Sequence, residues 1–396
     1  MSVKDQEGFP PHLIDSSIDE KRQYFADYAV AHTVLNDVHA RLISSIRHPY
    51  GKQLIFVIGP PGVGKTFLLR WAEDDLREMW RAEQETDRGR IPVVSIEVPS
   101  RDTHKPTPKD IYLRVLRALE EPLITQKIIH GDVVMHHNGD GRAVVDSRVT
   151  TFRLRYAMEQ ALKQRRPFAL FIDEAQHLFN IAGLALPEIM DWIKSIANMS
   201  GVLIVLYGTY EMFEMLDLSD QLIRRSLIIH LRRYGGGNAD RVAFLSAINA
   251  FQKNMPLSQE PDLLPHWAYL YERTAGCIGN LYDWLAGAYN LALCDSAATV
   301  TLKDLKSTVP LSTKRAATMC QNITKDEANL IGLIGEDDAE PRMSDNASKK
   351  GTSKGASQGV GSEVLRKSTQ VAAPRQSRVG ERKPGRDKIG GTGNAE

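Results

Sequence analysis

The chain is 396 residues long, 42% hydrophobic and 25% charged, with a formal net charge of +1, as expected for a soluble globular protein of two domains. Its three cysteines, Cys277, Cys294 and Cys320, form no CxxC pair, which excludes a cysteine zinc site and a disulfide framework. The polar Met1–Glu20 segment does not resemble a signal peptide, and no apolar run approaches the roughly 18 residues of a membrane helix, so we expect a cytoplasmic protein without membrane contact.

The first part of the chain predicts a sheet layered with helices. Residues 1–18 lack periodicity and are expected to form a flexible arm, whereas apolar residues recur at helical spacing over residues 18–46. Leu54–Ile58 is a continuous apolar run typical of a buried parallel strand. Similar runs follow at residues 92–98, 168–172, 202–207 and 227–231, and helical patterns separate them at residues 66–81, 109–119, 151–164 and 187–197. This alternation predicts an α/β fold with a doubly wound parallel sheet over residues 19–236.

The remaining segments differ from this pattern. Residues 122–147 interrupt it with two apolar runs around a polar centre, which predicts a hairpin or a mobile loop. Residues 237–335 show only helical patterns and predict a second, helical domain. Residues 336–396 are rich in Gly, Ser, Lys and Arg and predict a disordered basic tail, which is either a contact segment or a solvated linker.

A phosphate-binding loop lies between the first predicted strand and the next helix. The pattern GxxxxGK[ST] is matched without exception by Gly59-Pro60-Pro61-Gly62-Val63-Gly64-Lys65-Thr66, and Phe67 follows it. In such a loop the backbone N–H groups and the helix N-terminus face phosphate oxygens. Lys65 would reach the β- and γ-phosphates, and the Thr66 hydroxyl would bind Mg²⁺. The sequence therefore predicts ATP and Mg²⁺ as cofactors.

Polar residues at the ends of later strands extend this prediction. The run 168–172 ends in Asp173, expected to position Mg²⁺, and Glu174, expected to act as the general base for the attacking water. Thr209 follows the apolar run 202–207 and would either sense the γ-phosphate or cap the next helix. Arg225, with Arg224 as the alternative, would stabilise transition-state charge on a neighbouring copy, unless it makes only a surface salt bridge.

These segments together resemble AAA+ ATPases, in which they recur in the same order. The resemblance extends over roughly residues 20–310. Within this superfamily the chain resembles the TnsC/TniB group of transposition regulators, with IstB and MuB proteins as functional cousins. The features that carry this finer resemblance are Ala31-His32, Ala175-Gln176-His177 and the segment 274–281.

The resemblance implies a function. Such proteins bind ATP and oligomerise as hexamer-like or heptamer-like rings, or as helical filaments, around double-stranded DNA, without reading its sequence. They bridge a TniQ-like target selector, in some systems guided by CRISPR machinery, to the transposase subunits, and ATP hydrolysis disassembles the filament.

The resemblance also places the DNA contacts. It assigns them to Lys109 and Thr150, and we add Arg101, Lys105 and Arg148 on charge alone, because such cations neutralise phosphates. The alternative is a solvated loop with ordinary charges.

The sequence departs from the AAA+ pattern at one place. Where many members carry a nucleotide-contacting arginine in the helical domain, this chain has Tyr282, preceded by Asn280. Two other functions share the same ATP site: a helicase loader or replication-initiation ATPase, and a signalling ATPase that assembles without DNA.

Overall fold

The computed structural model describes residues 8–28, 32–100, 105–122, 135–137, 143–145, 147–216 and 225–334, with the backbone alone at residues 135–137, 143–145, 147–150, 214 and 334. All of these residues lie within one compact unit, Met1–Pro341. The basic tail expected from residue 336 onward lies outside the described residues.

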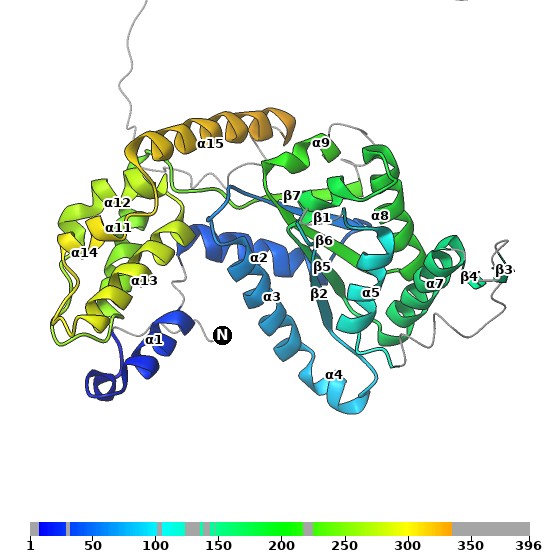
Figure 1. Ribbon diagram of the computed structural model, residues 1–396, viewed down its shortest axis with the longest axis horizontal. Coiled ribbons are helices and arrows are strands. Elements are labelled where there is room, and N and C mark those ends of the chain that lie inside the picture. Colours follow the sequence, from blue (N-terminus) through cyan, green and yellow to red (C-terminus); the bar gives the residue numbers. More distant parts are fainter. Residues whose placement is uncertain are drawn as a thin grey trace, which may run out of the picture. The chain divides into compact units, whose positions relative to one another are not determined.

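A five-stranded parallel sheet forms the centre of the first part of the chain (Figure 1). Its strands, in spatial order, are β2 (Val93–Glu97), β5 (Ala169–Asp173), β6 (Leu203–Gly208), β1 (Leu54–Ile58) and β7 (Ser226–His230). Each lies within one or two residues of a predicted strand, so the predicted parallel sheet is confirmed. Ligands of open parallel sheets bind beyond the carboxyl ends of the strands, which here include the end of β1.

Helices cover both faces of this sheet (Figure 1). Its two faces are covered by α2 (Thr33–Arg47) and α3 (Lys65–Met79) on one side, and by α5 (Pro108–Ala118), α7 (Ser147–Arg165) and α8 (Leu186–Ser200) on the other. Successive side chains of a strand point to opposite faces. Accordingly Ile55 and Val57 join the first core, and Leu54, Phe56 and Ile58 join the second. Burial on both faces explains why the strands are continuous apolar runs.

Shorter elements surround the sheet. They are the 3₁₀ turns η1 (Pro11–Ile14), η2 (Ala175–Asn180) and η3 (Tyr210–Met212), and the helices α1 (Ile18–Asp27), α4 (Arg81–Thr86) and α9 (Phe213–Leu216). Strands β3 (Met135–His137) and β4 (Ala143–Val145) pair antiparallel, which confirms a hairpin within residues 122–147.

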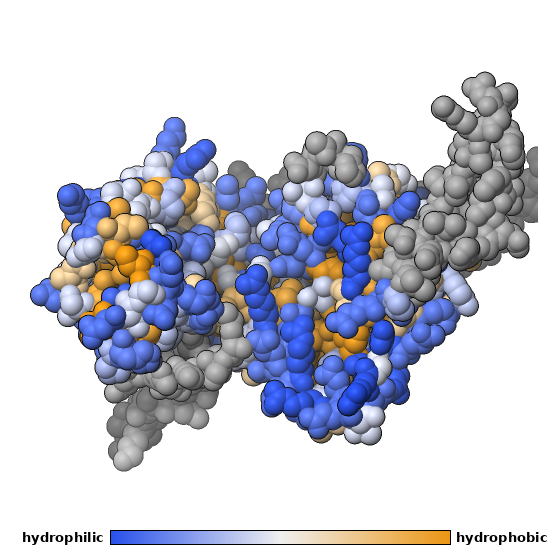
Figure 2. Space-filling view, turned by 60° about the horizontal axis from the view of Figure 1, so that its bottom comes forward, coloured by the Kyte–Doolittle hydropathy of each residue, from blue (hydrophilic) through white to orange (hydrophobic). Residues whose placement is uncertain are grey.

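The chain after the sheet is helical, as predicted. It contains α11 (Asn238–Lys253), η4 (Leu264–His266), α12 (Trp267–Thr274), α13 (Ile278–Cys294), α14 (Leu302–Ser307) and α15 (Thr313–Ile334). We refer to α11–α14 as the lid. Figure 2 shows one face of the molecule, on which hydrophilic side chains predominate and hydrophobic residues lie in patches between them. None of the described helices is both long and apolar enough for a bilayer span.

Candidate nucleotide-binding site

The predicted phosphate loop connects β1 to α3 at the carboxyl edge of the sheet. Gly64 precedes α3 in the left-handed region, with φ of 106°, and Gly62 has φ of 74°. Residues that carry a side chain rarely adopt these backbone angles, so the two glycines allow the loop to curl back over the start of the helix. The loop therefore has the backbone conformation that the sequence pattern requires.

Lys65 is folded into this loop. Its side chain is buried, and Nζ donates hydrogen bonds to the carbonyl oxygens of Gly59 (3.0 Å) and Pro60 (2.9 Å). Burial lowers the pKa of Lys65, and the nearby carboxylates of Glu174 and Asp173 oppose this shift. The ammonium group thus lies inside the loop, opposite two acids from a different strand.

Thr66 and Asp173, the two predicted Mg²⁺ ligands, are in direct contact. Thr66 Oγ1 donates a hydrogen bond of 2.9 Å to Asp173 Oδ2, and the backbone N–H of Glu174 donates one of 2.9 Å to Asp173 Oδ1. Burial raises the pKa of Asp173, and these two hydrogen bonds lower it. A hydroxyl and a carboxylate side by side are oxygen donors suited to a hard cation such as Mg²⁺.

Glu174 and Thr209 are connected through one intervening side chain. Glu174 has a left-handed backbone (φ 52°), and its carboxylate accepts a hydrogen bond from Gln176 Nε2. Gln176 Oε1 in turn accepts a hydrogen bond of 3.2 Å from the backbone N–H of Thr209. The Thr209 hydroxyl is buried and has no hydrogen-bond partner among the described residues. Such an orphaned hydroxyl at the strand end is what a phosphate oxygen or a water molecule would satisfy.

The lid rests on the phosphate loop. The backbone N–H of Asn280, in the first turn of α13, donates a hydrogen bond of 2.9 Å to the carbonyl oxygen of Gly62. Tyr282 points elsewhere, since its hydroxyl donates to the carbonyl oxygens of Phe25 (3.4 Å) and Ala26 (3.3 Å). The position that carries an arginine in many AAA+ proteins is therefore used here to hold α1.

A cavity of about 220 Å³ lies beside the loop, between the sheet and the lid. Its walls come from four separate parts of the chain: Ala26, Tyr28, His32 and Leu35; Val63, Gly64, Thr66, Phe67 and Arg70; Phe251; and Ile278, Gly279 and Tyr282. Each of the four parts contributes at least one aromatic ring to the lining. Sequence reasoning anticipated only Val63, Gly64, Thr66 and Phe67 among these residues. Most of the others come from segments as far apart as Ala26 and Tyr282, and only folding brings them together.

His32 is a neutral wall residue of this cavity. Burial, and to a smaller extent the Arg232 guanidinium, lower the pKa of His32 to about 4. Its Nδ1 accepts a hydrogen bond of 3.3 Å from the backbone N–H of Leu35 and lies 2.9 Å from the Tyr234 hydroxyl. The proton of the neutral ring is therefore on Nε2, which remains a donor.

Arg225 lies at the opposite edge of the sheet. Its side chain is exposed, and its carbonyl oxygen accepts a hydrogen bond of 3.2 Å from the backbone N–H of Gln53, just before β1. Gly59 lies six residues beyond Gln53, at the other end of β1. At 3.3 Å per residue, it is about 20 Å from Arg225. An arginine side chain does not span that distance, so Arg225 cannot reach the loop of its own chain. Arg224 lies outside the described residues.

A second cavity, of about 570 Å³, lies on the other side of the loop. Pro61, Thr209 and Glu211 line it together with one face of α15, which contributes Lys314 and Arg315 among others. Neither α15 nor this cavity could be placed from the sequence, because both depend on how the last helix packs.

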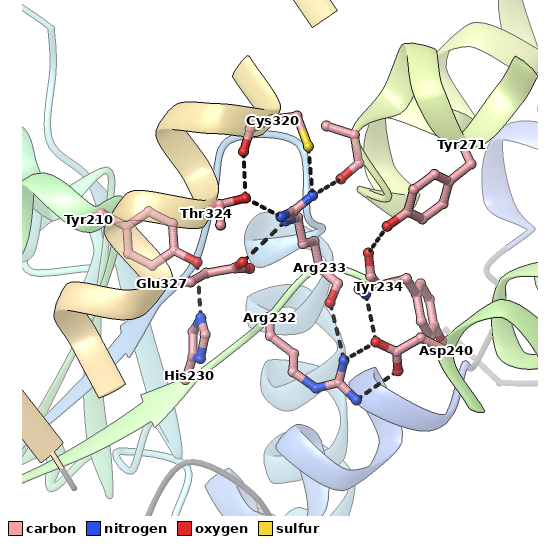
Figure 3. Close-up of polar contacts among 12 residues, drawn as sticks. Tyr210, His230, Arg232, Arg233, Tyr234, Asp240, Tyr271, Cys320, Thr324 and Glu327 are labelled. Atoms are coloured by element: carbon pink, nitrogen blue, oxygen red, sulfur yellow. Dashed lines mark hydrogen bonds and ion pairs between the residues drawn. The ribbon is translucent and has the colours of Figure 1, made fainter. Parts of the chain in front are cut away.

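A polar cluster fixes α15 to the end of β7 (Figure 3). Arg233 is buried and donates hydrogen bonds to the carbonyl oxygen of Ala275 (3.1 Å), to Thr324 Oγ1 (2.8 Å) and to Glu327 Oε2 (3.2 Å). Its neighbour Arg232 makes a two-pronged ion pair with Asp240 at 2.7 and 2.9 Å. The sheet, the lid and α15 thus meet at one guanidinium group.

The predicted DNA contacts are only partly described. Lys105 is exposed, and Lys109 is half-buried in the first turn of α5, whose N-terminus is capped by Thr107 and Asp110. Thr150 and Arg148 lie in the first turn of α7, which packs against α5, but their side chains are outside the described residues, as is all of Arg101. On the next turns of α7, Phe152 and Tyr156 are 70% and 57% exposed. The sequence argument, which used charge, did not single out this aromatic pair.

Comparison with known proteins matches one part of the chain to a family. Residues 47–216 match the family model described as AAA domain. This match, the parallel sheet with β1 between β6 and β7, and the phosphate loop confirm the predicted P-loop AAA+ fold with a helical lid. No curated protein matched the chain.

Solved structures with a similar course of the chain include replication proteins. The ORC2 protein of Aeropyrum pernix in ADPNP-ADP complexes is 12% identical, with 73% of this chain and 70% of that chain covered and a TM-score of 0.49. The ORC1 protein of Aeropyrum pernix in complex with DNA is 17% identical, with 72% and 68% covered and a TM-score of 0.49. Domain III of the Thermotoga maritima replication initiation protein DnaA is 14% identical, with 76% and 98% covered and a TM-score of 0.41. We base the fold assignment on the family match and the strand order.

Proposed function

We propose that this chain is an ATPase that uses ATP and Mg²⁺ as a switch for assembling on double-stranded DNA. The observation that carries this proposal is the convergence of Lys65, Thr66, Asp173, Glu174 and Thr209 at one edge of the sheet. These residues come from three separate segments, and their contacts support the roles proposed for them.

The roles follow from the contacts. Lys65 would exchange its bonds to loop carbonyls for the β- and γ-phosphates, and the loop N–H groups would hold the remaining phosphate oxygens. Mg²⁺, bound by Thr66 and Asp173, would neutralise charge on the phosphates. Glu174 would accept a proton from the attacking water, and the unpaired Thr209 hydroxyl would donate to a γ-phosphate oxygen.

The cavity between loop and lid is suited to the base of the nucleotide. It adjoins Gly64 and Thr66, so a base placed there leaves its phosphates at the loop. Aromatic side chains such as Tyr28 and Phe251 offer ring faces for stacking, and His32 supplies a hydrogen-bond donor. A nucleotide in this position would contact the sheet and the lid at once.

Self-assembly is proposed from the position of Arg225. Because it is exposed and lies about 20 Å from its own loop along parallel strands, an arginine at this place acts only on a neighbouring copy. ATP would then bind between two copies, and only a ligand with different affinity for the assembled and free states shifts their equilibrium. Ring or filament formation with ATP follows from this arrangement.

For the biological role we propose DNA transposition, as suggested by the resemblance to the TnsC/TniB group. In that role the assembly would mark target DNA through Lys109, Thr150, Arg101, Lys105 and Arg148 and would bridge a TniQ-like selector to the transposase subunits. Lys109 lies in the first turn of α5 and Thr150 in the first turn of α7, and the packing of these two helices against each other supports a common surface for the two positions. A helicase loader or replication initiator would use the same ATP site with a different partner.

The test is electron microscopy of the purified protein with double-stranded DNA in ATP, a non-hydrolysable analogue or ADP. Rings or filaments on DNA with the triphosphates alone are the expected result. Oligomers that form with ATP but ignore DNA would overturn the DNA-bound part of the proposal, and the absence of nucleotide-dependent oligomers would overturn the switch. Affinity capture from the source cell then separates transposition from replication, since a transposase and a replicative helicase are different partners.

A further inference from the structure

Gln176 connects the two sides of the candidate catalytic centre. It lies in η2, directly after β5, and is only 5% exposed. Its Nε2 donates to the carboxylate of Glu174, and its Oε1 accepts from the backbone N–H of Thr209 at 3.2 Å. The side chain therefore joins the end of β5 to the end of β6.

The orientation of this amide is determined by its partners. A backbone N–H can only donate and a carboxylate can only accept, so the oxygen of Gln176 must face Thr209 and the nitrogen must face Glu174. A flipped amide would place two donors together and two acceptors together. The hydrogen bond to the ionised Glu174 is charge-assisted and thus among the stronger kinds.

Close packing holds the amide in this place. A Cβ atom added to Gly208 would lie 2.8 Å from Gln176 Oε1 and 2.2 Å from Met212 Sδ, so the amide packs closely against a strand end that only glycine allows. On the other side, Glu174 has φ of 52°, a conformation that costs free energy in a residue other than glycine and that clusters at functional sites. The carboxylate is thus positioned by a strained backbone and by one side-chain donor.

We infer that Gln176 is a positioning residue that orients the Glu174 carboxylate and ties it to the strand end carrying Thr209. The inference rests on the proposed function, in which Glu174 is the general base. With one carboxylate oxygen occupied by Gln176, the other is left to accept the proton of water. The water oxygen then forms a bond to the γ-phosphorus as the bond to the ADP oxygen breaks, and the proton is later released with the phosphate. A hydrogen bond between Thr209 and the γ-phosphate would thereby hold the Glu174 carboxylate in the orientation in which it accepts a proton from the attacking water.

The test compares Gln176→Met with a matched variant elsewhere. Gln252 makes the same pair of bonds, since its Nε2 donates to Glu260 Oε1 (2.9 Å) and its Oε1 accepts from Leu263 N–H (3.1 Å), and it is 6% exposed. It belongs to α11, away from the acids. We expect Gln176→Met to lower kcat by about 10- to 100-fold with ATP affinity within about threefold of the original, because small misplacement of a catalytic group costs rate and not binding. Gln252→Met should leave kcat within about twofold while removing equivalent hydrogen bonds.

A double-variant cycle separates positioning from general damage. If Gln176 acts through Glu174, adding Gln176→Met to Glu174→Gln should not lower the single-turnover rate further. An additional 10-fold loss in that background, or unchanged kcat in Gln176→Met alone, would overturn the inference and leave the ATPase proposal intact. Full turnover by Glu174→Gln itself would instead overturn the assignment of the base, and the inference with it.

Discussion

The contact between lid and phosphate loop can be tested with one methyl group. Gly279 is the second residue of α13, and a Cβ atom there would lie 2.6 Å from the carbonyl oxygen of Gly62. The added Cβ atom is fixed to the helix backbone and the oxygen belongs to the loop backbone, so side-chain rotation cannot relieve the overlap. Gly279→Ala should therefore move the start of α13 away from the loop and lengthen the 2.9 Å hydrogen bond between Asn280 and Gly62.

The expected magnitude follows from the overlap. Overpacking by one methyl group typically costs about 1–3 kcal/mol. Because the strain falls on the wall shared by the loop and the base cavity, we expect it to weaken ATP binding, by about 5- to 150-fold at 1.4 kcal/mol per factor of ten. The fold should tolerate the change, since alanine is the better helix former.

The control is a second glycine of the same helix. A Cβ atom at Gly287 would meet its nearest neighbour, Thr308, at 3.9 Å, which is ordinary contact. Gly287→Ala should thus raise the free energy of unfolding by about 0.5–1 kcal/mol and leave ATP affinity unchanged. Isothermal titration with ATP and urea denaturation measure the two quantities. Gly279→Ala protein that binds ATP as tightly as the original chain would refute the lid contact as a determinant of the nucleotide site.

Four further variants test the other parts of the argument. Lys65→Ala should abolish ATP-dependent assembly, seen as loss of nucleotide-dependent particles in light scattering. Glu174→Gln should keep ATP binding and trap the assembled state, with phosphate release reduced to a slow residual rate that single-turnover assays still measure. Lys109→Ala should weaken DNA binding equally for all sequences and reduce the salt slope by about 1, measured by anisotropy at several salt concentrations. Arg233→Met should lower the free energy of unfolding by about 3–5 kcal/mol at pH 7.5, since Glu327 keeps a buried charge without its partner. Burial raises the pKa of Glu327, and Arg233 opposes this shift. The loss of stability in Arg233→Met should therefore become smaller as the pH falls through the raised pKa, because the Glu327 carboxyl then becomes neutral.

The fold was predictable where local sequence and tertiary burial agree. Each strand of the sheet is buried on both faces, so its apolar run is visible in the sequence without knowledge of its neighbours. The phosphate loop is equally local, because its conformation depends on glycines such as Gly62 and Gly64 within eight residues. The acids after β5 were found for the same reason, since a run that must be buried ends at Asp173 where the chain reaches the sheet edge.

What the sequence could not supply depends on contacts between distant segments. The cavity beside the phosphate loop joins Tyr28, Phe251 and Tyr282, which share no periodicity and no motif. Arg233 is one of many arginines, and only folding buries it against α15. Gln176 was noted as part of a resemblance, but its role appears only when Thr209, thirty-three residues later, lies opposite it. These are long-range pairings, about which a pattern of apolar spacing contains no information.

The two sides of the nucleotide site differ in what they can distinguish. The lid contributes to the base cavity and to a loop carbonyl, so its contacts are the same for ATP and ADP. In the proposed site the γ-phosphate would meet Lys65, Thr209 and the Mg²⁺ held by Thr66 and Asp173, together with the arginine of a neighbouring copy. A ligand shifts an equilibrium only by its differential affinity for the two states. Under the proposed function, we therefore expect the discrimination between ATP and ADP to come from the phosphate loop, from the ends of β5 and β6 and from the partner's Arg225, and not from closure of the lid.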